Sequence, residues 1–109
     1  MSINMINSDF MERAMHEEKQ ITIVYMDQEN EIEEDINISP MKTVSYLKGE
    51  IERVFNLNPG TLEGKKLRMK KRGQRTGELL DDNNKTLFDY RIQNGAKITF
   101  TILENVGGK

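Results

Sequence analysis

The chain has 109 residues, 31% of them charged, which predicts one soluble domain. Its formal net charge is only −2, so no overall electrostatic field favours nucleic acid or membrane as the partner. It has no cysteine, which excludes disulfides and thiolate zinc sites. Its single histidine, His16, lies in a polar N-terminal stretch, so a Ser-His-Asp triad is improbable. We therefore expect no enzyme, no catalytic residue, no cofactor and no metal.

Residues 1–19 form a polar segment without strand pattern or the apolar core of a signal peptide. Apolar residues recur in it at helical spacing: Phe10, Met11, Ala14 and Met15. Because so short a helix is marginal in water, we expect a flexible or weakly helical arm; a helix that docks on the body or on a partner is the alternative. No apolar run in the chain reaches the ~18 residues of a membrane helix, so we expect no membrane contact and a cytoplasmic or nuclear location, or both.

Residues 20–104 carry the pattern of a folded domain, which opens with a predicted hairpin. Residues 21–26 are rich in β-branched and aromatic side chains, which favour a strand. A polar turn over residues 27–30 leads to a second strand over residues 31–39, where Ile36 and Ile38 alternate with polar neighbours. The short turn predicts antiparallel pairing.

A helix is predicted next. Its apolar residues recur at helical spacing: Val44, Leu47, Ile51, Val54 and Phe55. Thr43 is the expected N-cap, and Asn58-Pro59-Gly60 is expected to end the helix, because proline cannot continue it. On this spacing the charged side chains fall mostly on the solvent face: Lys48, Glu50, Glu52 and Arg53.

The rest of the domain predicts strands that return to the same sheet. Residues 66–70 alternate with period two, residues 72–77 form a polar loop, and Leu79-Leu80 is a short return. A compact turn over residues 86–90 precedes the last strand, residues 97–103. The order of elements indicates an α+β fold, a mixed sheet of four to five strands with one helix packed across it.

Two stretches resemble a known family. Residues 86–93 (TLFDYRIQ) closely resemble the ubiquitin segment before its last strand, and residues 36–44 (INISPMKTV) resemble the end of its second strand through its helix cap. Leu-Phe-Asp-Tyr, with residues 54–59, also resembles the ubiquitin-like domain of the UHRF ligases. The resemblance covers roughly residues 20–108 and implies a ubiquitin-like β-grasp. In that fold Leu87 fills the core and Tyr90 buries its ring while its hydroxyl finds a backbone partner.

The tail, residues 105–109, ends in Gly107-Gly108-Lys109. In the ubiquitin family a Gly-Gly end is exposed by a processing protease and joined to target lysines by activating and conjugating enzymes. Glycine suits this use because those enzymes close narrow channels around the backbone. The resemblance thus implies conjugation through Gly108, with Lys109 as a one-residue propeptide; chance or cloning is the alternative source of the two glycines.

Bases gather in residues 65–75: Lys65, Lys66, Arg68, Lys70, Lys71, Arg72 and Arg75. Aligned with ubiquitin, Arg68 takes the centre of its apolar docking patch, flanked by Thr99 and Thr101, so ordinary ubiquitin-binding domains should bind this chain poorly. An acidic peptide is the expected partner of this surface, and the absence of aromatic side chains disfavours nucleic acid. Alternatively it is a solvated face balanced by nearby acids: Glu29, Glu31, Glu33, Glu34 and Asp35.

Two functions follow from these observations. The first is a monomeric protein modifier, processed after Gly108 and linked to target lysines by an isopeptide bond. The second is a non-conjugated ubiquitin-like interaction module whose basic sheet face docks an acidic partner.

Overall fold

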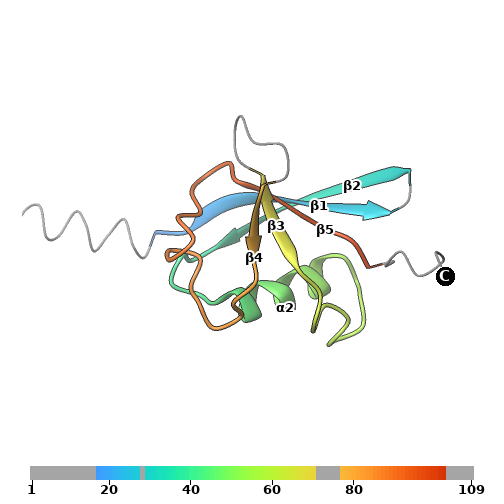
Figure 1. The fold of residues 1–109 in the computed structure, drawn as a ribbon. Helices are drawn as coiled ribbons and strands as arrows, with labels where there is room; N and C mark the ends of the chain where they lie inside the picture. The colour runs from blue at the N-terminus through green and yellow to red at the C-terminus, as the bar shows by residue number, and fades with distance from the viewer. Residues whose placement is uncertain (1–16, 28, 71–76, 103–109) are drawn as a thin grey trace, which may run out of the picture.

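The computed structural model describes residues 17–27, 29–70 and 77–102. Its elements follow the expected order: β1 (Lys19–Asp27), β2 (Asn30–Ile38), α2 (Val44–Val54), β3 (Leu67–Lys70), β4 (Glu78–Leu80) and β5 (Lys97–Phe100) (Figure 1). Parts of three predictions lie outside the described residues: most of the N-terminal arm, the bases Lys71, Arg72 and Arg75, and the tail with Gly107, Gly108 and Lys109.

The strands form a mixed sheet of five strands in the order β2-β1-β5-β3-β4. The hairpin of β1 and β2 is antiparallel, β1 pairs with β5 in parallel, and β3 pairs antiparallel with both β5 and β4. Helix α2 packs across one face of this sheet, and no element of the described residues covers the other face (Figure 1). The ubiquitin-like β-grasp is therefore confirmed.

Helix α2 begins at the predicted residue and ends several residues before the predicted end. Thr43 caps it with an extended backbone, and its hydroxyl accepts a hydrogen bond from the Tyr46 amide at 3.1 Å. The helix ends at Val54, because Asn56 takes a left-handed backbone with φ 60° and reverses the chain. The expected stop at Asn58-Pro59-Gly60 is thus wrong, and these residues belong to the turns that follow.

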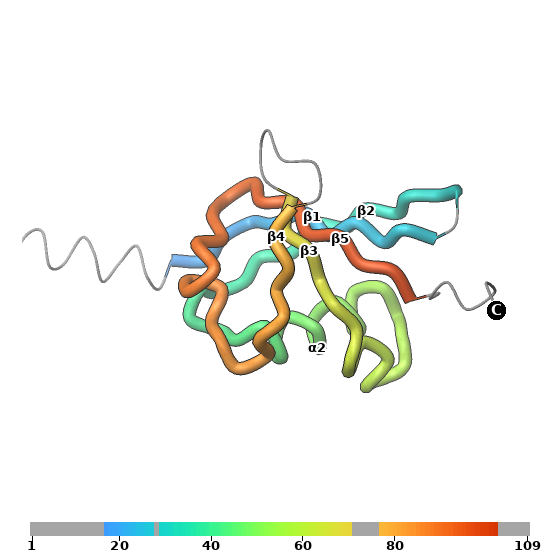
Figure 2. The backbone as a smooth tube through the Cα atoms, viewed as in Figure 1, coloured from blue at the N-terminus to red at the C-terminus, as the bar shows by residue number. Residues whose placement is uncertain are grey.

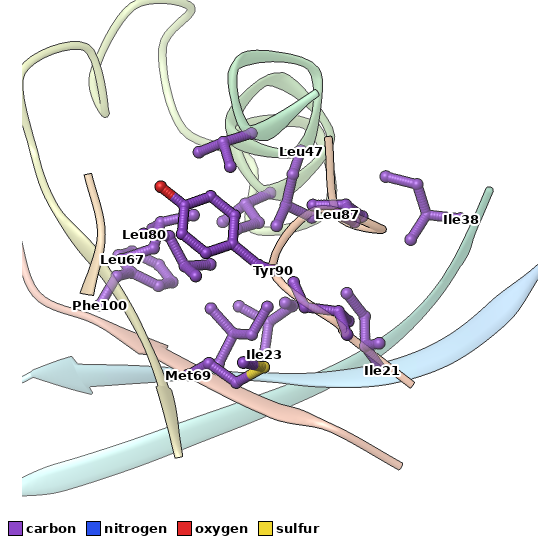
Figure 3. Packing of buried hydrophobic residues seen from close by; sticks show 14 of the residues in the cluster. Ile21, Ile23, Ile38, Leu47, Leu67, Met69, Leu80, Leu87, Tyr90 and Phe100 are labelled. Atoms are coloured by element: carbon purple, nitrogen blue, oxygen red, sulfur yellow. The ribbon is translucent and has the colours of Figure 1, made fainter. Parts of the chain in front are cut away.

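The core lies between α2 and the sheet (Figure 3). Tyr90 contributes its ring to this core, while its hydroxyl accepts a hydrogen bond from the Asp82 amide at 3.0 Å. Leu87 is 1% exposed, so both predictions for this loop are confirmed. At one end of the core the Tyr25 and Phe100 rings stack with centroids 4.9 Å apart, and Phe55 meets both edge-on.

Lys48 departs from the expected solvent face of α2. Its side chain is 7% exposed, because it packs on the core-facing side of the helix beside Leu47 and Ile51. This burial lowers the pKa of Lys48, the neighbouring charge of Lys66 lowers it further, and Glu52 and Glu63 oppose the change. Since no buried side-chain nitrogen or oxygen of the described residues lacks a hydrogen-bond partner, the Lys48 ammonium reaches water while its methylenes stay buried.

Candidate docking face

The alternation of side chains along β1 shows which of its residues lie on the uncovered face of the sheet. Ile21 and Ile23 point into the core, so Thr22, Val24 and Met26 point to the uncovered side. Cross-strand pairing carries this assignment to β2, where three acids lie opposite these residues. Glu31 pairs with Met26, Glu33 with Val24 and Asp35 with Thr22. We call Glu31, Glu33 and Asp35 the acidic edge.

The other side of the same face is basic. Lys97 and Thr99 on β5 lie opposite Thr22 and Val24, and on β3 Lys70 lies opposite Lys97 and Arg68 opposite Thr99. Continuing this register places Lys66 opposite Thr101. The basic half is accordingly Lys66, Arg68, Lys70, Lys97, Thr99 and Thr101. The structure thus brings together the predicted surface residues that it describes, with Arg68 exposed beside Thr99.

The acids do not neutralise the bases of β3. The strands that carry the two groups are three strand spacings apart, about 14 Å, which exceeds the Debye length of about 8 Å at physiological salt. Among the described residues, one ion pair crosses the face, Lys97 Nζ to Glu33 Oε2 at 3.9 Å, between half-exposed side chains. In the same part of the chain no carboxylate forms an ion pair with Lys66, Arg68 or Lys70.

A hollow of about 170 Å³ lies on the boundary between the two charged parts, with Lys70 and Lys97 on one side and Glu31 on the other. Val24 and Met26 form its apolar lining, and Val24 is only 2% exposed although it lies outside the main core. The sequence reasoning missed Val24, Met26 and Lys97 as members of this face. The alternation within residues 21–26 is a signal that assigns Val24 and Met26 to the uncovered face.

Two structural features are absent from the residues that the structure describes. They hold no group of three or more histidine, cysteine, aspartate or glutamate side chains arranged to bind a metal ion. Within the same ranges, no helix combines the length and apolar character that a membrane crossing requires.

Comparison with known proteins gives a family model that covers most of the chain. The model of the ubiquitin-like domain matches residues 10–101. No curated protein sequence matches this chain significantly.

Solved structures of low sequence identity share the fold. The C-terminal ubiquitin-like domain of mouse tubulin-specific chaperone e has a TM-score of 0.59 at 15% identity, covering 79% of this chain and 87% of that one. The N-terminal ubiquitin-like domain of tubulin-binding cofactor B from Drosophila melanogaster has a TM-score of 0.59 at 19% identity, with 78% and 84% covered. Ubiquitin from Caldiarchaeum subterraneum gives 0.54 at 20% identity, with 84% and 99% covered.

Proposed function

This chain belongs to the ubiquitin-like domain family, and from that premise we propose that it is a non-conjugated interaction module whose basic half docks an acidic segment of a partner protein. The observation that carries the proposal is the pair of bases Arg68 and Lys70 on β3, beside Thr99 on β5, which form no ion pair with any acid of the described residues. Two of the similar structures are ubiquitin-like domains of larger proteins named for tubulin, which supports the use of this fold as a built-in module. The module acts as a monomer, without chemistry of its own, in the cytoplasm or nucleus.

The chemistry of the basic half suits carboxylates. The guanidinium of Arg68 can donate two parallel hydrogen bonds to one carboxylate, while Lys66 and Lys70 add charge on either side along the strand. The hydroxyl of Thr99 can donate a further hydrogen bond to a second acid. The acidic edge repels acids, so it fixes the side of the sheet on which an acidic segment lies.

Fluorescence anisotropy with the full chain tests this proposal. The probe is a fluorescein-labelled peptide of alternating glutamate and glycine, which carries charge but no apolar side chain. We expect Arg68→Glu to weaken binding about tenfold, and a rise from about 50 to 300 mM NaCl to weaken it several-fold, because exposed charges are screened. Arg53→Glu is the matched control, since Arg53 is exposed on α2, which packs on the opposite face of the sheet. Equal losses in the two variants would argue against a specific dock.

The second candidate is the conjugated modifier, and one sequence feature favours it. Gly107 and Gly108 follow the last strand at the place where the family carries its reactive end, with Lys109 in the position of a residue to be removed. The likeness to a ubiquitin from Caldiarchaeum subterraneum is compatible with this use. A modifier needs a protease, activating and conjugating enzymes and target lysines, whereas the interaction module needs none of these.

A further inference from the structure

A second hollow, of about 460 Å³, lies at the other end of β1, beside the loop that leads to β5. Backbone hydrogen bonds hold its walls together: the Gly95 amide donates to the Gln20 carbonyl and the Phe88 amide to the Pro40 carbonyl, both at 2.8 Å. Figure 2 shows the start of β1 next to this loop. The hollow is therefore formed by segments already fixed in the fold.

The hollow has an apolar lining with positive charge around it. Pro40 and Ile92 are buried, and Phe88, which also lines it, is 46% exposed, an unusual exposure for a phenylalanine. Lys19 and Arg91 are the charged side chains of the lining. Aromatic and arginine side chains are enriched in protein interfaces, so this combination is typical of a docking pocket.

No acid within the described residues neutralises these two cations. Lys19 and Arg91 have no ion-pair partner there. Asp89 is the nearest acid along the loop, but it is not part of the lining, and its carboxylate accepts a hydrogen bond from the Thr86 amide at 3.1 Å. The hollow therefore presents an apolar surface together with two cations that form no ion pair within the described residues.

We propose that this hollow, the Phe88 pocket, docks a linear segment of a partner protein that carries one bulky apolar side chain between carboxylates. The volume lies within the range of about 300–1,000 Å³ that is usual for ligand pockets, and it suits one large side chain with the backbone on either side of it. The apolar side chain packs against Phe88, Pro40 and Ile92, and the carboxylates meet Lys19 and Arg91. No residue of the basic half lines the pocket, so this site is independent of the proposed sheet-face dock.

Arg91 offers a variant that separates binding from folding. It has a backbone φ of 60°, a conformation that asparagine tolerates better than arginine and that Asn56 also adopts in this chain. Arg91→Asn therefore keeps the backbone of the loop and removes one cation of the pocket. A loss of binding in this variant without a loss of stability cannot come from a damaged loop.

The test is a titration of the ¹⁵N-labelled full chain with an end-capped peptide of one leucine between two pairs of glutamates. We expect saturable shifts of the amide signals of Phe88, Arg91 and Ile92. Arg91→Asn should weaken binding about fivefold and Phe88→Ala about tenfold, while Arg53→Gln on α2, outside both proposed docking sites, leaves it unchanged. Two further peptides, with glutamine in place of glutamate or alanine in place of leucine, should bind more weakly.

Three results would overturn the proposal. The first is shifts confined to the sheet face around Arg68 and Thr99, which would leave the proposed function standing and remove the second site. The second is equal binding of all three peptides. The third is nuclear Overhauser contacts between the Phe88 ring and residues 1–16 in the absence of peptide, which would make the chain's own segment the occupant.

Discussion

At the scale of single residues, Tyr90 links the loop before β5 to the turn after β4. Its hydroxyl satisfies the Asp82 amide at 3.0 Å and lies 3.4 Å from the Asp81 carboxylate. We predict that Tyr90→Phe lowers the free energy of unfolding by about 1–2 kcal/mol, because the Asp82 amide loses its partner in a part-buried site. Urea unfolding measures this loss. Tyr46→Phe is the control, since Tyr46 is 46% exposed, and a loss of the same size there would contradict the assigned role.

Lys48 gives a prediction that depends on pH. Burial lowers its pKa in the folded protein, so between the lowered value and the ordinary 10.5 the unfolded chain binds more protons, and stability rises with pH. Lys48→Met keeps the apolar stem and removes the charge, so the variant should be more stable at pH 7. The difference between the two proteins should shrink as the pH rises towards 10.5. Urea unfolding at pH 7 and pH 10 checks both statements, and a difference independent of pH would show that packing alone causes it.

At the scale of elements, an added Cβ is expected to have opposite effects on stability at two glycines. Gly77 precedes β4 with φ +77°, and a Cβ there would come within 2.5 Å of the Met69 carbonyl oxygen on β3. Gly49 lies inside α2, where an added Cβ meets nothing within 4 Å. We predict that Gly77→Ala lowers the free energy of unfolding by about 2 kcal/mol, whereas Gly49→Ala raises it by about 1 kcal/mol. Thermal unfolding of the two variants measures both changes in stability. Destabilisation by Gly49→Ala would contradict the prediction for α2.

The elements that the sequence predicts well are those with local signals. The Thr43 cap and the alternation of Leu67 with Met69 depend on neighbours a few residues away, and both are confirmed. The parallel pairing of β1 with β5 has no local signal, because it joins strands from opposite ends of the domain. The charge of Lys48 favoured the solvent face, but position 48 follows Val44 by four residues and lies beside Leu47 and Ile51 on the buried side of α2.

The candidate sites also contain some features with local sequence signals and others that depend on distant segments. Arg68 could be assigned to the uncovered face from alternation, and the threonines beside it from the alignment with ubiquitin. The separation of the acidic edge from the basic half needs the order of all five strands, which no single stretch of sequence carries. The Phe88 pocket needs three distant segments, at Lys19, Pro40 and Arg91, to meet in space.

At the scale of the whole molecule, the fold offers two positively charged surfaces that do not share residues. One is the basic half of the sheet, and the other is the Phe88 pocket at the end of β1. A chain with a net charge of −2 thus concentrates positive charge where partners would dock, and keeps its acidic edge on β2. The proposed docking of acidic segments depends on this distribution of charge.

The proposed function requires that the chain works as a free interaction module and not as a covalent tag. Intact-mass measurement of the protein, recovered under denaturing conditions from the cells that make it, tests this most directly. We expect an unattached chain with no covalent protein adducts, and the same result for Gly108→Ala. Adducts of higher mass that disappear in Gly108→Ala would contradict it and establish the modifier.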